Sequence, residues 1–248
     1  MPTQSRANPV PLLLTRPEPQ AADFARHVEA RFGAQVRIIK TPLLAPRFYA
    51  PDLPTGPFAG LILTSQTGVE AYLRLGQAVH ALPRDVYCVG SRTADAARGA
   101  QLRPILIAQD AASLTAQIKA QPPQGTLLHL RARETRGDIT NQLALAGIET
   151  VDAVIYAQEK RNLTNDAQSA LQDSHPVLVP LFSPRTAFIF TMELTRTGSV
   201  SPLLVAAMSD DVALELRAVP SRISVAERPD AGAMLDSLAR LLADMQRA

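Results

Sequence analysis

Hydroxyl side chains follow several short apolar runs, each just before a helix-like period. The stretch 61–73 reads LILTSQTGVEAYL and places Thr64 and Ser65 after its apolar run. A later stretch, VLVPLFSPRTAFIF, has the same form and places Ser183 there, and Ser209 closely follows a third run, LLVA. Hydroxyls and free backbone N–H groups at the start of a helix bind anions well. These positions are therefore candidate ligand contacts.

Further candidates follow other apolar runs. Gly90 allows a tight turn after VYCV, and Thr93 falls in the helical turn that comes next. Arg16 and Arg131 come directly after the strand-like runs LLLT and LLHL. A guanidinium can grip a carboxylate or phosphate with two hydrogen bonds, so both arginines suit an acidic ligand.

Each of these residues also has a simpler interpretation. A single Ser or Thr before a helix is commonly a plain N-cap, worth ~1 kcal/mol of stability. An arginine at the rim of a sheet is commonly a solvated charge. The recurrence of hydroxyls at equivalent places in both halves of the chain favours ligand binding for the set.

Conventional catalytic motifs are absent. The sequence contains no GxGxxG, GxxxxGK[ST], HExxH or CxxC pattern. The four histidines are scattered, and His129 is expected inside a strand. The single cysteine, Cys88, lies in an apolar run, where a small buried core residue is expected. We therefore expect no cofactor and no metal, and we expect any catalysis to come from holding a reactive substrate in one geometry.

Short apolar runs that alternate with helical periods must position these residues. The runs are rich in Val, Ile and Leu, as strands covered on both faces should be. We expect strands at 11–14, 35–39, 61–64, 86–89, 104–107, 127–130, 151–156, 177–182, 203–206 and 223–226. Helices are expected between them, including one over 67–82 and a last one from near Asp230. This alternation predicts parallel sheets, with ligands beyond the carboxyl ends of the strands.

The chain also repeats itself. Each half divides into three pieces in the same order, at an offset of about 115 residues. The run that ends at Leu14 corresponds to the run that ends at His129, and Thr64-Ser65 corresponds to Phe182-Ser183. Two copies of one unit predict two similar domains.

Composition and charge narrow the classes of protein. The chain has 248 residues, 46% of them hydrophobic, which suffices for one large domain or two small ones. Its 25 basic and 23 acidic residues leave a net charge of +2, too balanced for a nucleic-acid-binding patch. No apolar run is long enough to span a bilayer, and the N-terminus has no apolar signal core. We therefore expect a cytoplasmic protein. We also expect a monomer, because no apolar stripe is left over for a partner.

Several of these segments, taken in order, resemble the uroporphyrinogen-III synthase family. LLLTRPEPQAADFARHVEARFGAQVRIIKTPLL resembles the opening strand, Thr-Arg-Pro and helix of the family. LILTSQTGVEAYL, YCVGSRTADAARGAQLRP, VDAVIYAQEKR and LFSPRTAFIF resemble its later segments. Each motif is weak alone, but the ordered set is fairly specific and covers roughly residues 11–244.

The resemblance implies an α/β fold with two similar flavodoxin-like domains, each with a parallel sheet, joined by a two-stranded linker. Domain 1 would be discontinuous, with residues 1–38 and 160–248, and domain 2 would span 42–152. The linkers would fall near 37–44 and 152–160. This arrangement agrees with the repeat, because each domain would take one piece from one half of the chain and two pieces from the other.

The resemblance also implies a reaction. The family cyclises hydroxymethylbilane, a small linear tetrapyrrole, to uroporphyrinogen III with loss of water and inversion of ring D through a spiro intermediate, without a cofactor or metal. Such a polycarboxylate suits a cleft lined with N–H groups, hydroxyls and arginines. The substrate-binding candidates are Arg16, Thr64, Ser65, Gly90, Thr93, Arg131, Ser183 and Ser209. Tyr156 matches the tyrosine of the family; it either assists departure of the hydroxyl as a neutral donor or packs as a linker residue.

The C-terminal half departs from the pattern of the family. AAMSDDVALEL stands where the family has Gly-x-x-Thr-Ala, so Met208 or Ser209 replaces the Gly, and Asp210 and Asp211 add negative charge. Phe182 stands where a Thr usually precedes the Ser. Two alternatives therefore stay open, a non-catalytic two-domain protein that binds a small polycarboxylate and a diverged inactive relative.

Overall fold

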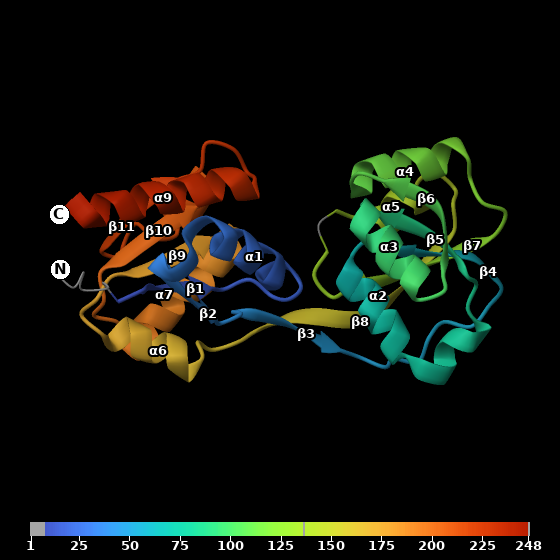
Figure 1. Cartoon of the computed structure of the whole chain (residues 1–248). Coiled ribbons are helices and arrows are strands. Elements are labelled where there is room, and N and C mark those ends of the chain that lie inside the picture. The colour runs from blue at the N-terminus through green and yellow to red at the C-terminus, as the bar shows by residue number, and fades with distance from the viewer. Residues whose placement is uncertain (1–7, 136, 248) are drawn as a thin grey trace. The chain divides into compact units, whose positions relative to one another are not determined.

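The computed structural model of the chain describes residues 8–135 and 137–247, and its contacts divide the chain into two units (Figure 1). Unit 1 comprises Met1–Ala45 and Lys160–Ala248, and unit 2 comprises Pro46–Glu159. Each unit is built around its own β-sheet. Ten of the described strands overlap the expected apolar runs, with ends that differ by up to four residues, but the strand at Leu44–Phe48 was not expected.

The sheet of unit 1 is parallel and has the strand order of flavodoxin-like folds. Its five strands, in spatial order, are β2 (Val36–Lys40), β1 (Val10–Leu14), β9 (Val177–Leu181), β10 (Leu203–Ala207) and β11 (Ser221–Val225). All of its neighbouring strands pair in parallel. Counted along the chain, the order is 2-1-3-4-5, which is that of doubly wound flavodoxin-like sheets.

The sheet of unit 2 repeats this order with a rotated starting point. Its strands, in spatial order, are β3 (Leu44–Phe48), β8 (Thr150–Lys160), β7 (Thr126–Ala132), β4 (Phe58–Leu63), β5 (Asp85–Val89) and β6 (Arg103–Ala108). From β8 to β6 the pairs are parallel. The order is again 2-1-3-4-5 if β7 is counted first. The strands of each sheet therefore come from both halves of the repeat, which is the arrangement that the family resemblance implies.

β3 and β8 together carry the chain across the boundary between the units. The Tyr49 N–H donates to the Ile155 carbonyl and the Arg161 N–H to the Leu43 carbonyl, so the two strands run in opposite directions. The linkers expected near 37–44 and 152–160 overlap residues that the structure places in strands of the two sheets. Residues 37–40 continue β2 beside β1, because the alternation that buries Ile39 is that of a sheet strand. The first part of β8 pairs with β7 before the strand continues as a linker.

Helices cover both faces of each sheet (Figure 1). In unit 1, α1 (Gln20–Phe32) and α9 (Ala231–Arg247) lie against one face, and α6 (Asn165–Gln172), α7 (Pro184–Thr197) and α8 (Asp210–Leu214) lie against the other. Successive strand residues point to opposite faces, so Leu13 packs on the α6 and α7 side while Leu12 and Leu14 pack with α1 and α9.

Unit 2 is layered in the same way. The helices α2 (Gln66–Arg74) and α3 (Ser91–Gly99) cover the face that holds Leu61 and Leu63, and α4 (Ala111–Ala120) and α5 (Ile139–Ala144) cover the face that holds Ile62. The helix expected over 67–82 is interrupted at Gly76, whose φ of +59° ends the α-helix, and a 3₁₀ helix, Gly76–Ala81, follows.

Exposed apolar side chains are present on the surface. Phe188 and Met192 lie one turn apart on α7 and are about half exposed, and Leu145 in unit 2 is almost fully exposed. Within the described residues, no helix combines the length and the apolar character that a membrane crossing requires.

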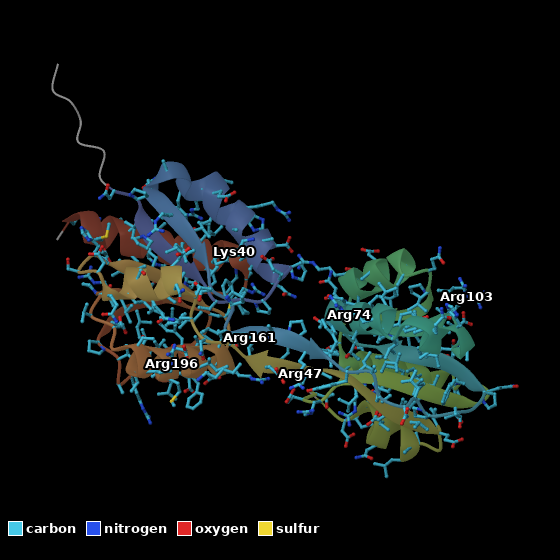
Figure 2. The ribbon with its side chains drawn as sticks, turned by 90° about the horizontal axis from the view of Figure 1, so that it is seen from below. Lys40, Arg47, Arg74, Arg103, Arg161 and Arg196 are labelled. Atoms are coloured by element: carbon cyan, nitrogen blue, oxygen red, sulfur yellow. The ribbon has the colours of Figure 1, made fainter. Side chains whose placement is uncertain are left out.

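A buried carboxylate holds the chain where it re-enters unit 1. The Glu193 side chain on α7 is fully buried and accepts the Leu163 N–H at 3.0 Å. Arg196, labelled in Figure 2, lies 2.7 Å from the same carboxylate, and Lys160 lies 3.3 Å away. The hydrogen bonds from Arg196 lower the pKa of Glu193 to about 2, although burial opposes the shift. Glu193 therefore connects the end of β8, the start of α6 and the body of α7.

Glu193→Gln should lower the free energy of unfolding by about 2 kcal/mol at neutral pH, because a charge-assisted hydrogen bond becomes a neutral one. The folded pKa of Glu193 is depressed from an ordinary value of 4.5. Its contribution to stability is thus complete above about pH 5 and is lost as the pH falls toward about 2. Urea unfolding followed by circular dichroism at several pH values measures both effects.

Glu70→Gln is the matched control. Glu70 pairs with Arg74 on the exposed face of α2, so this change should cost less than about 0.5 kcal/mol. The difference between wild type and Glu193→Gln should shrink in acid. A difference that stays constant from neutral pH down to about 2 would show that the charge of Glu193 does not contribute to stability.

Candidate active site

A cavity of about 290 Å³ lies at the carboxyl edge of the sheet in unit 2. It collects residues that follow β4, β5, β6 and β7, as expected for parallel strands whose carboxyl ends meet at one edge. Its lining consists of Thr64, Val89, Gln109, Asp110, Ala111, His129, Ala132, Glu134, Thr135, Gly137, Ile139 and Tyr156. Thr64 and Tyr156 are the sequence-predicted site residues in this lining.

Ser65 and Tyr156 are joined although they lie 91 positions apart in the sequence. Ser65 is the N-cap of α2, and its Oγ accepts the Gly68 N–H at 2.9 Å. The same Oγ lies 2.7 Å from the Tyr156 hydroxyl. A Cβ at position 68 would lie 3.3 Å from Ser65 Oγ and 3.4 Å from Leu63, so glycine leaves room for this close arrangement.

This geometry can leave the Tyr156 hydrogen free for a ligand. Ser65 Oγ accepts the Gly68 N–H and can still donate its own hydrogen to the Tyr156 oxygen. Tyr156 is only 6% exposed, and burial raises the pKa of its phenol while the Ser65 hydrogen bond opposes that shift. The phenol is thus neutral at pH 7 and can donate into the cavity.

A local irregularity in β8 directs Tyr156 toward Ser65. Arg131 of β7 pairs with Val154, but the next residue, Ala132, pairs with Tyr156, so Ile155 is an extra residue in β8. Ile155 and Tyr156 consequently both pack with the core on the α2 and α3 side. Bulges of this kind re-aim side chains at the edges of sheets.

Gly90 and Thr93 take structural positions at the start of α3. Gly90 has a φ of +80°, in the region that favours glycine, and its N–H donates to the Ala108 carbonyl at 2.7 Å. Thr93 is buried in the first turn of the helix. The described lining of the cavity includes neither residue.

Arg131 is engaged within unit 2. Its Nε donates to Asp152 at 2.8 Å, and its Nη1 donates to the Ala132 carbonyl at 3.0 Å. Burial opposes ionisation of Asp152, but hydrogen bonds from His129, Thr140 and Arg131 hold the pKa of the carboxyl well below its usual range. Arg131 therefore holds this edge of the sheet together.

Sequence reasoning missed the grouping of His129, Thr140 and Asp152. His129 Nδ1 lies 3.2 Å from both Thr140 Oγ1 and Asp152 Oδ1, and the two strand residues pair directly across β7 and β8. The available signal was a polar residue inside each of two consecutive apolar strands. Parallel pairing of those strands brings the two residues together.

In unit 1, Arg16 and Ser183 lie next to Phe182. The Arg16 guanidinium stacks over the Phe182 ring at 4.1 Å, and that ring meets Phe24 edge-on at 4.9 Å. Ser183 is the N-cap of α7, and its Oγ accepts the Thr186 N–H at 3.2 Å. Phe182, which departs from the usual threonine of the family, is partly buried, packs against the core and supports Arg16.

Ser209 precedes α8, which spans only the five residues from Asp210 to Leu214. Ser209 makes no side-chain cap bond, and Asp210 and Asp211 are exposed in the first turn. Positive φ values occur, outside glycine, only at Gln101 among the described residues. The turn that contains Met208 therefore does not require the glycine that its counterpart at Gly90 does.

Many other cations pair with carboxylates. Figure 2 labels several that do so, namely Lys40 with Glu18, Arg47 with Glu159, Arg74 with Glu70, Arg103 with Asp85 and Arg196 with Glu193. Most of these pairs are exposed and belong to the solvated surface, the simpler interpretation of the arginine content.

Two further expectations concern Cys88 and metals. Cys88 is a buried core residue, as predicted, and burial raises the pKa of its thiol to about 11. Across residues 8–135 and 137–247, no group of three His, Cys, Asp or Glu side chains is arranged to hold a metal ion.

Comparisons with known proteins agree on one family. Residues 33–236 match the family model described as uroporphyrinogen-III synthase HemD. The uroporphyrinogen-III synthase of Chlorobaculum parvum is 27% identical over 191 residues, which cover 71% of this chain and 76% of the relative. The crystal structure of uroporphyrinogen-III synthetase from Helicobacter pylori 26695 has the same fold, with a TM-score of 0.60 and 19% identity over 94% of this chain and 99% of that one. Because the family model spans most of its length, the chain belongs to the uroporphyrinogen-III synthase family.

Proposed function

We propose that this chain cyclises hydroxymethylbilane to uroporphyrinogen III, with ring D inverted and water lost, as a step in heme biosynthesis. Membership of the family makes it an enzyme of tetrapyrrole synthesis, a hydro-lyase by reaction type. The match therefore favours the enzyme over a non-catalytic binding protein or an inactive relative.

The observation that carries the mechanism is the hydrogen bond between Ser65 and Tyr156 at the cavity of unit 2. Donation along the series Gly68 N–H, Ser65 Oγ and Tyr156 hydroxyl polarises the phenol toward a ligand. The hydroxyl group that leaves the bilane gains negative charge in the transition state. A neutral phenol that donates to this oxygen stabilises the charge where it develops.

The enzyme mainly has to control geometry. The bilane can close without help to the isomer in which ring D is not inverted, so the enzyme must favour one transition state over another. This task needs a substrate held in one orientation more than it needs strong acids or bases. A site with a neutral phenol and several hydroxyls suits it.

The predicted substrate contacts divide into two groups. We propose that Arg16, Thr64 and Ser183 contact the substrate, with Ser65 acting through Tyr156. Gly90, Thr93 and Arg131 shape the carboxyl edge of unit 2, because each is held in a turn, buried or paired within that unit. Ser209 stays a prediction from the sequence.

The chain is proposed to act in the cytoplasm as a monomer without a cofactor. Phe188 and Met192 on α7 are among the exposed apolar side chains that a second copy could cover. Light scattering of the purified chain should give a molar mass near 26.7 kDa. A mass twice that value would refute the monomer.

The reaction itself is tested by supplying hydroxymethylbilane and separating the uroporphyrinogen isomers by chromatography. The wild-type chain should give mainly isomer III, because ring D inversion occurs only under enzyme control. Formation of isomer I alone, at the spontaneous rate, would refute the proposed reaction.

Tyr156→Phe should lower kcat roughly 100-fold, because one donor to the transition state is lost. Slow turnover also lets spontaneous closure compete, so the fraction of isomer I should rise. Tyr87→Phe is the matched control, since Tyr87 is a buried tyrosine on the other face of the same sheet. Equal kcat values for the two variants would remove Tyr156 from the mechanism.

A further inference from the structure

The cavity of unit 2 contains a buried hydrogen-bonding group that the proposed mechanism does not use. His129 is 3% exposed and lines the cavity, and its Nε2 has no hydrogen-bond partner among the described residues. Buried polar atoms are nearly always hydrogen-bonded, and the exceptions often mark a site of function. The unpaired Nε2 therefore points to a ligand in the cavity.

The neighbours of His129 determine which ring nitrogen carries the hydrogen. The Thr140 hydroxyl donates to Asp152 Oδ1 at 2.5 Å, so it has no hydrogen left for the imidazole. Nδ1 lies 3.2 Å from both of these oxygens. Nδ1 must therefore be the donor, and in the neutral ring the buried Nε2 carries a lone pair that none of the described residues uses.

The rest of the lining suits a ligand that donates hydrogen bonds. Asp110 and Glu134 add carboxylates to the cavity, and the Asp110 side chain also caps α4 by accepting the Ser113 N–H. Together with the Nε2 lone pair, these groups repel the carboxylates of a tetrapyrrole. They match the pyrrole N–H groups, which are donors.

We propose that His129 is a further substrate-binding residue, whose Nε2 accepts a hydrogen bond from a pyrrole N–H of the linear tetrapyrrole. The inference rests on the proposed function, because it takes its ligand from that reaction. When the hydroxyl group departs, the ring that bore it becomes electron-poor and its N–H becomes a stronger donor. The bond to Nε2 should thus be stronger in the transition state than in the ground state and should appear mainly in kcat.

Two substitutions separate a ligand contact from a structural role. His129→Asn places an amide near the position of Nδ1, so it retains the contact with Asp152 and Thr140 and loses the group that faces the cavity. His129→Gln reaches the position of Nε2 and offers an amide oxygen to the cavity, but it gives up the contact with Asp152. A structural role predicts that Asn is tolerated and Gln is not, and a ligand contact predicts the reverse.

The experiment measures kcat, KM and isomer composition with hydroxymethylbilane for the full-length variants. We expect His129→Asn to lower kcat about 10- to 100-fold with little change in KM, and His129→Gln to lose less than about fivefold. His27→Asn, an exposed histidine on α1 of unit 1, is the control and should leave both constants unchanged.

The outcomes distinguish this inference from the proposed function. If wild type makes isomer III and His129→Asn is as active as wild type, the inference is wrong and the function stands. If His129→Gln is the more damaged of the two variants, His129 serves Asp152 and the inference is again wrong. If wild type makes only isomer I, the proposed function itself fails.

Discussion

The parallel pairing of the strands is the constraint on which the rest of the structure depends. In each unit it brings the carboxyl ends of the parallel strands to one edge, where helices begin with unpaired N–H groups. Ser65 and Ser183 occupy this position after β4 and β9, and each caps the helix that follows. A capping hydroxyl can serve a second purpose, since an oxygen that accepts an N–H can still donate its own hydrogen, as Ser65 can to Tyr156. The two interpretations of the sequence are compatible.

The polar side chains near the cavity of unit 2 lie on two different faces of the sheet. His129 and Arg131 lie two residues apart on β7 and both meet Asp152, while Tyr156 turns toward α2 because of the extra residue in β8. The regular alternation of a strand would have put Tyr156 on the same face as Asp152. The irregular register instead lets one short segment of β8 supply a carboxylate to one group of residues and a phenol to another. Both groups reach the same cavity.

The departures of the C-terminal half from the family pattern have physical explanations in unit 1. Phe182 replaces a hydroxyl but packs against Phe24 and carries Arg16 on its ring. The turn before α8 proceeds without a positive φ, so no glycine is needed there. Asp210 and Asp211 are exposed, where their charge is well solvated. These changes are compatible with a stable unit.

The sequence alone indicated most of the strands and the parallel α/β class, because short runs of Val, Ile and Leu alternate with helical periods. It also indicated Thr64, and the internal repeat predicted two similar domains. The family resemblance added Tyr156, which lines the cavity with Thr64, and implied sheets with strands from both halves. Only the tertiary structure decided that Tyr156 contacts Ser65, that Arg131 pairs with Asp152, and that His129 lines a cavity with an unpaired Nε2. Those facts depend on strand register, on one extra residue in β8 and on contacts between residues far apart in the chain. Local sequence patterns do not encode such contacts, since period and propensity describe one element at a time.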